Sequence, residues 1–364
     1  MINTILFFLV GLVILILGAD LLVRGASRLA AAFGISPLVI GLTIVAIGTA
    51  SPEIAVSIQA AAIGQGDLTL GNVLGSNIFN ILFILGVTSI LAPILIAEQL
   101  IRKDAPILLG VSLLTFVLAL DGNLGAMDGT ILLSLLVVYM FFALRQSRSE
   151  SSEVQKEYAE EYAKKVSRTT KSIFTNSLFI LIGLGLLVFG SNWLVESAVQ
   201  IATVLGVSEL IIGLTIVAMG TSLPEVATSV IAAFKGESDI AVGNAVGSNI
   251  FNLLGVLGIG ALVSPDGIFV AQTVLQFDLP VMVFVALVTL PVFYIDSRIS
   301  RIEGGLLLSY YIIYVALVIL LAVESSSLPS VQSSITFFVP ITFILLVVAA
   351  IRSALTKRQN SSTR

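Results

Sequence analysis

Apolar runs of membrane-spanning length recur along the whole chain. They are about 18 to 25 residues long, the length of an α-helix that crosses the hydrocarbon core of a bilayer. Hydrophobic residues make up 57% of the sequence and charged residues only 11%, whereas soluble domains are nearer half apolar and a quarter charged. The first run, from about Ile5 to Val23, has no basic segment before it and predicts a membrane helix, not a signal peptide. The pattern therefore predicts an all-α membrane protein.

The runs predict about eleven transmembrane helices, arranged as two inverted five-helix repeats plus one extra C-terminal helix. Their expected spans are 4–23, 36–62, 70–92, 105–121, 128–144, 173–194, 208–233, 241–263, 272–294, 304–323 and 335–352. These spans divide the chain into a first repeat at 1–144, a cytoplasmic linker at 145–172, a second repeat at 173–323, and an extra helix with a cytoplasmic tail at 324–364. We expect the linker to be a solvated connection between the halves, and the extra helix to serve for packing or anchoring.

The placement of basic residues predicts the orientation in the membrane. If the N-terminus faces out, all 18 Lys and Arg residues fall on the inner side: seven in short loops, seven in the linker and four in the tail. The outward loops carry acidic residues only. Since Lys and Arg concentrate in cytoplasmic loops, we expect an integral protein of a prokaryotic inner membrane, with the N-terminus outside and the C-terminus in the cytoplasm.

The sequence repeats itself at an offset of 172 residues, without a gap, from about residue 9 to residue 93. The segment GLTIVAIGT at 41–49 matches GLTIVAMGT at 213–221 in eight of nine positions, and GNVLGSNIFN at 71–80 matches GNAVGSNIFN at 243–252 in eight of ten. Five helices in each copy is an odd number, so the second copy enters the membrane the opposite way up. Inverted repeats are typical of secondary transporters, whose site lies near the midplane between the copies.

Matched glycines are part of this repeat. Gly11 and Gly18 correspond to Gly183 and Gly190. Two GxxxG patterns, which let membrane helices approach closely, are formed by Gly71, Gly75, Gly243 and Gly247. We expect a structural role for them.

Each repeat carries one glutamate inside an otherwise apolar helix, Glu53 in the first copy and Glu225 in the second. A charge at the bilayer centre costs roughly 2.5–3.5 kcal/mol even on a lenient insertion scale, and such residues mark ion pathways. For a single glutamate the alternative is a protonated side chain that ties helices together. The duplication favours a site that the two side chains share.

Other polar groups accompany the glutamates. A proline precedes each one and removes a helical N–H, so the carbonyls of Gly48 and Gly220 become candidate cation ligands. Thr49 and Thr221 lie four residues before the glutamates, a spacing that places hydroxyl and carboxylate on one helix face. We also expect a further set of matched side chains to line the site, with bonding between helices as the alternative: Ser76, Asn80, Ser248 and Asn252.

The chain contains no Cys and no His. Thiolate metal sites, haem ligation by His or Cys, disulfides and His-based zinc sites are therefore excluded, and a metal ion must be bound by oxygen, as hard ions such as Ca²⁺, Mg²⁺ and Na⁺ are. Two glutamates neutralise one Ca²⁺, and the same ligands divided between neighbouring sites can hold Na⁺. We expect no cofactor beyond the transported Ca²⁺ and Na⁺. The expected partners are inorganic cations and the bilayer, without nucleic acid, for a chain that acts as a monomer.

GTASPE at 48–53, GTSLPE at 220–225 and the two GN..GSNIFN segments resemble the alpha repeats of the cation/calcium exchanger superfamily, and within it the prokaryotic sodium/calcium exchangers. The resemblance covers nearly all of residues 1–323. It implies a ten-helix core in which two helices slide across a stationary bundle. It also implies a ligand set, with the alanines contributing backbone carbonyls and one asparagine at the centre: Glu53, Glu225, Thr49, Thr221, Ala46, Ala218, Ser76, Ser248, Ser222 and Asn80.

The chain departs from the family pattern at two site positions. Ala50 stands where the first motif commonly has the serine that is present as Ser222 in the second, so one hydroxyl is missing. Several relatives carry Asp at the position of Asn252, which leaves this site with two carboxylates instead of three. Both departures bear on the number of Na⁺ ions bound.

These features predict a secondary transporter, not an enzyme, that exchanges Na⁺ for Ca²⁺ by alternating access. The alternative on the same fold is a Ca²⁺/H⁺ or other divalent-cation antiporter, because a carboxyl group in an apolar setting can hold a proton near neutral pH. A channel or an intramembrane hydrolase is a third hypothesis. The chain has no recognisable filter sequence or intramembrane-protease motif to support it.

Overall fold

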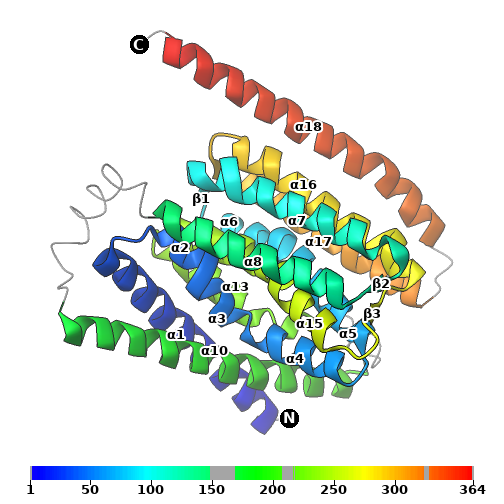
Figure 1. Cartoon of the computed structure of the whole chain (residues 1–364), viewed down its shortest axis with the longest axis horizontal. Helices are drawn as coiled ribbons and strands as arrows, with labels where there is room; N and C mark the ends of the chain where they lie inside the picture. Colours follow the sequence, from blue (N-terminus) through cyan, green and yellow to red (C-terminus); the bar gives the residue numbers. More distant parts are fainter. Residues whose placement is uncertain (1, 148–168, 207–215, 217, 324–327, 363–364) are drawn as a thin grey trace.

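A computed structural model of the chain describes residues 2–147, 169–206, 216, 218–323 and 328–362. The described residues are almost entirely helical, with two short two-stranded ribbons (Figure 1). Among the described residues, nine continuous helical spans are long and apolar enough to cross a membrane, and some of them combine several of the helices named below. The bent pair Pro37–Thr49 and Ser51–Ala62 forms a further broken span. The predicted membrane protein is therefore confirmed.

The first half of the chain contains these helices, of which those marked η are π- or 3₁₀-helical turns: α1 (Ile2–Phe33), α2 (Pro37–Ile40), η1 (Gly41–Val45), α3 (Ala46–Thr49), α4 (Ser51–Ala62), α5 (Gly66–Phe79), η2 (Asn80–Ile84), α6 (Leu85–Leu91), η3 (Leu100–Asp104), α7 (Ala105–Leu118), η4 (Ala119–Asp121) and α8 (Ala126–Ser147). The second half contains α10 (Thr170–Val204), α12 (Ala218–Gly220), α13 (Leu223–Phe234), α14 (Ser238–Phe251), η6 (Asn252–Val256), α15 (Leu257–Val263), η7 (Val274–Asp278), α16 (Leu279–Tyr294), α17 (Arg301–Ala322) and α18 (Leu328–Ser362).

Most predicted spans coincide with observed helices, with two differences. The first, sixth and eleventh helices were expected at 4–23, 173–194 and 335–352, but α1, α10 and α18 have 32, 35 and 35 residues. Arg24 and Arg28 therefore lie within α1 instead of in a loop, because a long helix continues past the apolar core and its basic side chains reach the polar zone. The seventh span, 208–233, is observed only in α12 and α13, since residues 207–215 and 217 lie outside the described part. The total of eleven helices stays a prediction.

The contacts between α1 and α10 show the inversion of the two repeats. A Cβ atom added to Gly18 would lie 2.9 Å from the carbonyl oxygen of Gly183, and one added to Gly11 would lie 3.1 Å from that of Gly190. In the repeat, Gly11 is equivalent to Gly183 and Gly18 is equivalent to Gly190. Gly11 therefore contacts the equivalent of Gly18, and Gly18 contacts the equivalent of Gly11. Equivalent helices therefore pack against each other antiparallel.

The two ribbons show the same exchange. β1 (Ile94–Leu95) pairs antiparallel with β4 (Arg298–Ile299), and β2 (Asn123–Leu124) pairs antiparallel with β3 (Ile268–Phe269). Each ribbon thus joins one strand of the first half to one strand of the second. The halves are interlocked and are not two separate units.

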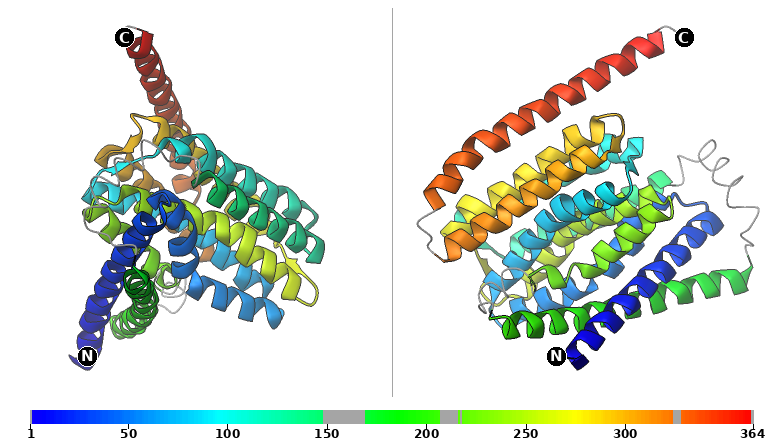
Figure 2. Two further views of the ribbon diagram at one scale, coloured as in Figure 1. Left: turned by 60° about the vertical axis from the view of Figure 1, so that its left-hand side comes forward. Right: turned by 180° about the vertical axis from the view of Figure 1, so that it is seen from behind.

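The buried side chains form two hydrophobic clusters. The larger one joins α5 to α8 with α14 to α17, and the smaller one joins α1 and α10 to η1, α13 and α14. In Figures 1 and 2, the α1–α10 pair lies on one side of the bundle and α18 on the opposite side. α18 packs on α16 and α17, where the Tyr310 and Thr342 hydroxyls are 2.6 Å apart. The extra helix therefore lies far from the α1–α10 pair.

Candidate functional site

Both glutamate-bearing helices are interrupted immediately before the acidic residue. α3 ends at Thr49, Ala50 leaves the helical conformation with φ −74° and ψ 7°, and α4 begins at Ser51. In the second repeat, α12 ends at Gly220 and α13 begins at Leu223. The prolines in the first turns explain the breaks, because proline cannot donate to the preceding turn. The Gly48 carbonyl accepts a hydrogen bond from Ser51 Oγ (2.7 Å), so a neighbouring hydroxyl satisfies it.

The glutamate side chains are buried between the repeats. Glu53 is 0% exposed and Glu225 is 1% exposed, and the two carboxyl groups are close enough to interact electrostatically. Ser222 Oγ donates a hydrogen bond to Glu53 Oε1 (2.8 Å). Glu53 Oε2 and both carboxyl oxygens of Glu225 have no hydrogen-bond partner among the described residues. The structure therefore brings the two acidic side chains into one buried region.

Each threonine lies near the glutamate of the other repeat. Thr49 is close to the Glu225 carboxyl group, and Thr221 is close to that of Glu53. The sequence spacing predicts that each threonine shares a helix face with its own glutamate, and the structure in addition brings it near the glutamate of the other repeat. The two copies thus exchange hydroxyl groups across the site.

The helices α5 and η2, with their counterparts α14 and η6, complete the site with amides and a hydroxyl. Ser76 Oγ lies 3.1 Å from Ser222 Oγ and accepts a hydrogen bond from Asn252 Nδ2 (3.1 Å). Asn80 Nδ2 donates to Asn249 Oδ1 (2.9 Å). The Oδ1 atoms of Asn80 and Asn252 are buried without a hydrogen-bond partner in the described structure. Asn80 and Asn252 also begin matched π-helical turns, a distortion that is frequent at functional sites.

The remaining predicted ligands lie at the edge of this region. Ser248 Oγ donates a long hydrogen bond to the Ala46 carbonyl (3.5 Å), which also accepts from the Ala50 N–H (3.0 Å). Ala218 begins α12, and its side chain lies outside the described residues. The Ala46 oxygen is thus placed near the site but already has protein partners.

Two asparagines that were not among the predicted ligands hold the glutamate helices in place. Asn72 Nδ2 donates to Ser57 Oγ (2.9 Å) and to the Glu53 carbonyl (3.4 Å). Asn244 Nδ2 makes the equivalent bonds to Ser229 Oγ (3.1 Å) and to the Glu225 carbonyl (3.4 Å).

The other end of each amide reaches the opposite repeat. Asn244 Oδ1 accepts a hydrogen bond from Thr49 Oγ1 (3.0 Å), and Asn72 Oδ1 accepts one from Thr221 Oγ1 (3.5 Å). Each asparagine therefore connects the glutamate helix of its own repeat to the threonine of the other repeat. Their match at the 172-residue offset was the signal that could have identified them.

A second pair of asparagines marks the centre of the exchange between repeats. Asn77 Nδ2 donates to the Asn249 carbonyl (3.3 Å), and Asn249 Nδ2 donates to the Asn77 carbonyl (2.9 Å). The two residues are 172 positions apart and make the same bond to each other. This reciprocal pair fixes α5 against α14 beside the carboxyl groups.

The region contains several buried oxygens that accept no hydrogen bond. Five buried oxygens without a hydrogen-bond partner belong to four residues of the described structure: Glu53, Glu225, Asn80 and Asn252. Leaving a buried acceptor unpaired costs about 1–3 kcal/mol, and more if it is charged. A cation coordinated by these oxygens would remove this cost. Among the described residues no group of three or more acidic side chains exists, so two carboxylates set the charge of the region.

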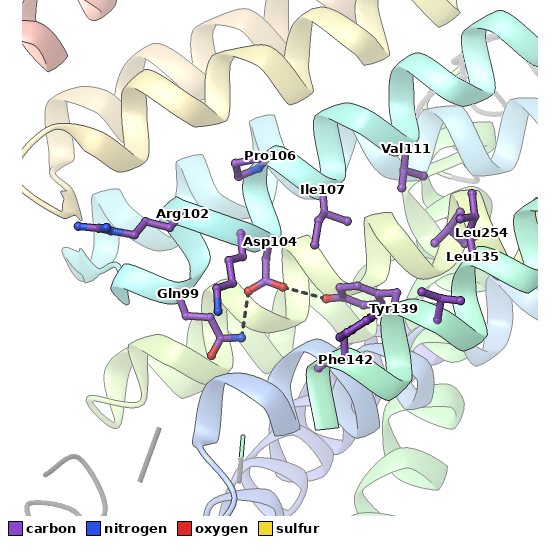
Figure 3. Close-up of a pocket in the computed structure, with 13 residues that line it drawn as sticks. Gln99, Arg102, Asp104, Pro106, Ile107, Val111, Leu135, Tyr139, Phe142 and Leu254 are labelled. Carbon is purple, nitrogen blue, oxygen red and sulfur yellow. Dashed lines mark hydrogen bonds between the residues drawn. The ribbon is translucent and has the colours of Figure 1, made fainter. Parts of the chain in front are cut away.

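A separate cavity of about 630 Å³ lies between η3, α7 and α8 (Figure 3). There Asp104 accepts hydrogen bonds from Gln99 Nε2 (3.2 Å) and from the Tyr139 hydroxyl (3.3 Å). The second half repeats the contact, since the Tyr314 hydroxyl donates to Asp278 Oδ1 (3.1 Å). Both aspartates precede the first turn of an equivalent helix, so we interpret these pairs as braces for α7 and α16.

Comparison with known proteins identifies relatives that match most of the chain. The family model described as sodium/calcium exchanger protein matches residues 3–145 and 175–320. The chain is 41% identical to the putative antiporter CaxA of Alkalimonas amylolytica over 310 residues, which cover 85% of this chain and 96% of that protein. It is 33% identical to the sodium/calcium exchanger MaX1 of Methanosarcina acetivorans over 339 residues, with the same coverage of 85% and 96%.

The fold also matches a solved structure. The sodium-calcium exchanger NCX_Mj superimposes with a TM-score of 0.74 at 32% sequence identity, and the match covers 87% of this chain and 98% of that chain. The match extends over both repeats and therefore includes the region between them.

Proposed function

The chain belongs to the sodium/calcium exchanger protein family and is an integral membrane exchanger, and we propose that it exchanges Na⁺ for Ca²⁺ at the buried region between Glu53 and Glu225. The observation that carries this proposal is the set of buried, unpaired oxygens on Glu53, Glu225, Asn80 and Asn252. All are hard donors, which Ca²⁺ and Na⁺ prefer. We propose that the two carboxylates neutralise one bound Ca²⁺.

Competition for shared ligands supplies the coupling. Ca²⁺ needs both carboxylates at once, whereas Na⁺ ions in neighbouring sites use the same oxygens together with the hydroxyls of Thr49, Thr221 and Ser76. An occupant of one kind therefore displaces the other. A bound cation neutralises the two carboxylates. Without it, two uncompensated negative charges would be buried, which is energetically costly. This cost opposes movement without an ion.

The α1–α10 pair is the element that we propose to move. It packs on the rest of the protein through the smaller hydrophobic cluster, separately from the larger one. Its glycine contacts keep the two helices together as one unit. A rigid helix pair that packs through a separate apolar cluster can slide and expose the site to alternate sides of the membrane.

The same proposal covers orientation and organisation. We propose that the N-terminus lies outside and the linker and C-terminus lie in the cytoplasm of a prokaryotic cell. The halves 1–144 and 173–323 act as the two repeats, and the linker 145–172 connects them. The region 324–364 supplies an extra helix, which anchors the chain, and a cytoplasmic tail. We propose a monomer that needs no cofactor besides its transported ions.

Flux measurements test the coupling. Proteoliposomes loaded with Na⁺ and diluted into Na⁺-free medium with radioactive Ca²⁺ should accumulate Ca²⁺, and those loaded with choline should not. Uptake that is independent of internal Na⁺ would reject Na⁺ coupling. Uptake driven by a pH gradient in Na⁺-free medium would establish the Ca²⁺/H⁺ alternative instead.

A further inference from the structure

A polar cavity of about 690 Å³ lies at one end of the α1–α10 pair, where it meets the turn between α13 and α14. Four basic residues from three different elements line it: Arg24 and Arg28 on α1, Lys171 on α10, and Lys235 in the turn. Glu237 is the acidic residue in the lining. Its lining contains none of the residues of the glutamate region.

Two of the four cations are already paired. Arg24 Nε lies 2.8 Å from Asp20 Oδ2, and Lys235 Nζ lies 2.6 Å from Asp20 Oδ1. The Lys235 ammonium group also donates to the Asp20 carbonyl (3.0 Å). These ion pairs join α1 to the α13–α14 turn and fix two positive groups at the wall of the cavity.

The other two cations have side chains without a partner. Neither Arg28 nor Lys171 makes a side-chain hydrogen bond or ion pair with a described residue, and Ser27 Oγ is buried without a hydrogen-bond partner. Asn176 and Thr175 add further polar groups to the lining. Lys171 lies in the first turn of α10, where the helix dipole adds positive potential. The cavity thus offers donors and positive charge to an anion.

The inverted repeat provides an internal comparison. A cavity of about 350 Å³ lies at the opposite end of the α1–α10 pair and includes Val199 and Gln200, the repeat equivalents of Ser27 and Arg28. Its lining carries no charge: Thr4, Val199, Gln200, Thr203 and Val204. There Thr4 Oγ1 donates to Gln200 Oε1 (3.1 Å), so the glutamine is paired where Arg28 is not. The scaffold is shared, and only one end is equipped for an anion.

We propose that the cavity between α1, α10 and the α13–α14 turn binds a phosphate group, with Arg28 and Lys171 as its principal ligands. Acceptor-only phosphate oxygens match this donor set. The group comes from the headgroup of an anionic phospholipid or from free inorganic phosphate. A bound phosphate links α1 and α10 to the turn that holds Lys235.

Thermal unfolding of the purified full-length chain in neutral detergent tests the proposal. Added dioleoylphosphatidylglycerol should raise the unfolding temperature saturably, and dioleoylphosphatidylcholine should not. Basic residues near anionic lipid contribute about 1 kcal/mol each, so R28Q together with K171Q should raise the half-saturating concentration about 30-fold. R28K together with K171R should keep the response, and R298Q together with R301Q, outside the cavity, should match the wild type.

The source of the phosphate follows from a second titration. A rise with inorganic phosphate that requires Arg28 and Lys171 assigns the site to a free phosphate, and a rise with the anionic lipid alone assigns it to a headgroup. The single variants R28Q and K171Q should each shift half-saturation about fivefold. An equal response of the wild type and the double glutamine variant, or equal effects of the two lipids, would overturn the proposal. None of these readouts depends on Na⁺/Ca²⁺ exchange.

Discussion

Glu53 and Glu225 occupy equivalent positions of the repeat but have different surroundings. Ser222 donates to Glu53, whereas Glu225 faces the first repeat, where the residue equivalent to Ser222 is Ala50. Both Glu225 oxygens are accordingly unpaired among the described residues, compared with one of Glu53. A single missing hydroxyl therefore makes the site asymmetric.

Restoring that hydroxyl should change the balance between ions. A50S adds an oxygen near Glu225, and a neutral hydroxyl suits Na⁺ without adding charge for Ca²⁺. The concentration of Na⁺ that half-inhibits Ca²⁺ uptake should fall, by about tenfold for a gain of roughly 1.4 kcal/mol. The matched variant S222A should shift it in the opposite direction. Equal Na⁺ inhibition in both variants and the wild type would show that these positions do not contact Na⁺.

Asn72 and Asn244, which connect each glutamate helix to the opposite repeat, lead to a second prediction. N244A removes the amide that holds the Glu225 helix and receives the Thr49 hydroxyl. Loss of such a supporting contact typically lowers metal affinity about 10–100-fold. Ca²⁺ uptake should show this increase in half-saturation while the protein still inserts. N192A, at an exposed position on α10, is the control. Unchanged uptake by N244A would argue against a supporting role of Asn244.

Sequence reasoning at this scale found the residue types but not their partners. The glutamates, threonines and Asn80 could be selected because they repeat at a fixed offset within apolar helices. The approach of Thr49 to Glu225 could not, because it depends on how the two repeats pack against each other. Asn72 and Asn244 were missed because a buried amide is as easily a contact between helices as a support for a ligand.

At the scale of helices, glycine determines how closely α14 approaches the first repeat. A Cβ atom added to Gly247 would lie 2.6 Å from both the Cα and carbonyl oxygen of Leu42, and one added to Gly243 would lie 2.9 Å from the Leu38 carbonyl. The predicted close approach is therefore observed in the second repeat. Gly71 and Gly75 have no such neighbour among the described residues.

Substitution at Gly247 should separate these helices. G247A forces a methyl group against Leu42 and should destabilise the protein by about 1–3 kcal/mol, the usual cost of overpacking. Its unfolding temperature in detergent should fall relative to the wild type. G110A is the control, because Gly110 is exposed on α7 and no described atom lies within 4 Å of an added Cβ. An unchanged unfolding temperature for G247A would contradict the close packing.

Helix ends were the least predictable elements. Apolar runs define what lies in the hydrocarbon core, so they located the spans but ended α1 and α10 about three turns too early. The breaks before Glu53 and Glu225 were predictable from proline. The π-helical turns at Asn80 and Asn252 had no signal in composition or spacing.

At the scale of the molecule, the repeat determined more of the architecture than any helix by itself. The repeat of an odd number of helices predicted inversion, and the glycine, asparagine and ribbon contacts between the two copies agree with it. Its fixed pairing also explains why the acidic side chains meet. The position of α18, outside the repeat, could not be predicted because no equivalent element indicates its neighbours.

Orientation is open to a direct test, since the chain has no native cysteine. Single cysteines replacing Asn3 and Ser353 should react differently with a membrane-impermeant thiol reagent added to intact cells. The first should be labelled and the second should be labelled only after the cells are opened, because basic residues stay in the cytoplasm. Labelling of both in intact cells would contradict the proposed topology.

Equilibrium binding of radioactive Ca²⁺ to the purified full-length chain tests the shared site most directly. We predict one Ca²⁺ per chain, displaced by increasing Na⁺, and loss of that binding by at least about 100-fold in E53Q and in E225Q, since removing a ligand exceeds the effect of removing its support. The thermal stability of both variants in detergent serves as the folding control. Full Ca²⁺ binding by folded E53Q or E225Q, or binding that Na⁺ does not displace, would contradict a site at which the two carboxylates meet both ions.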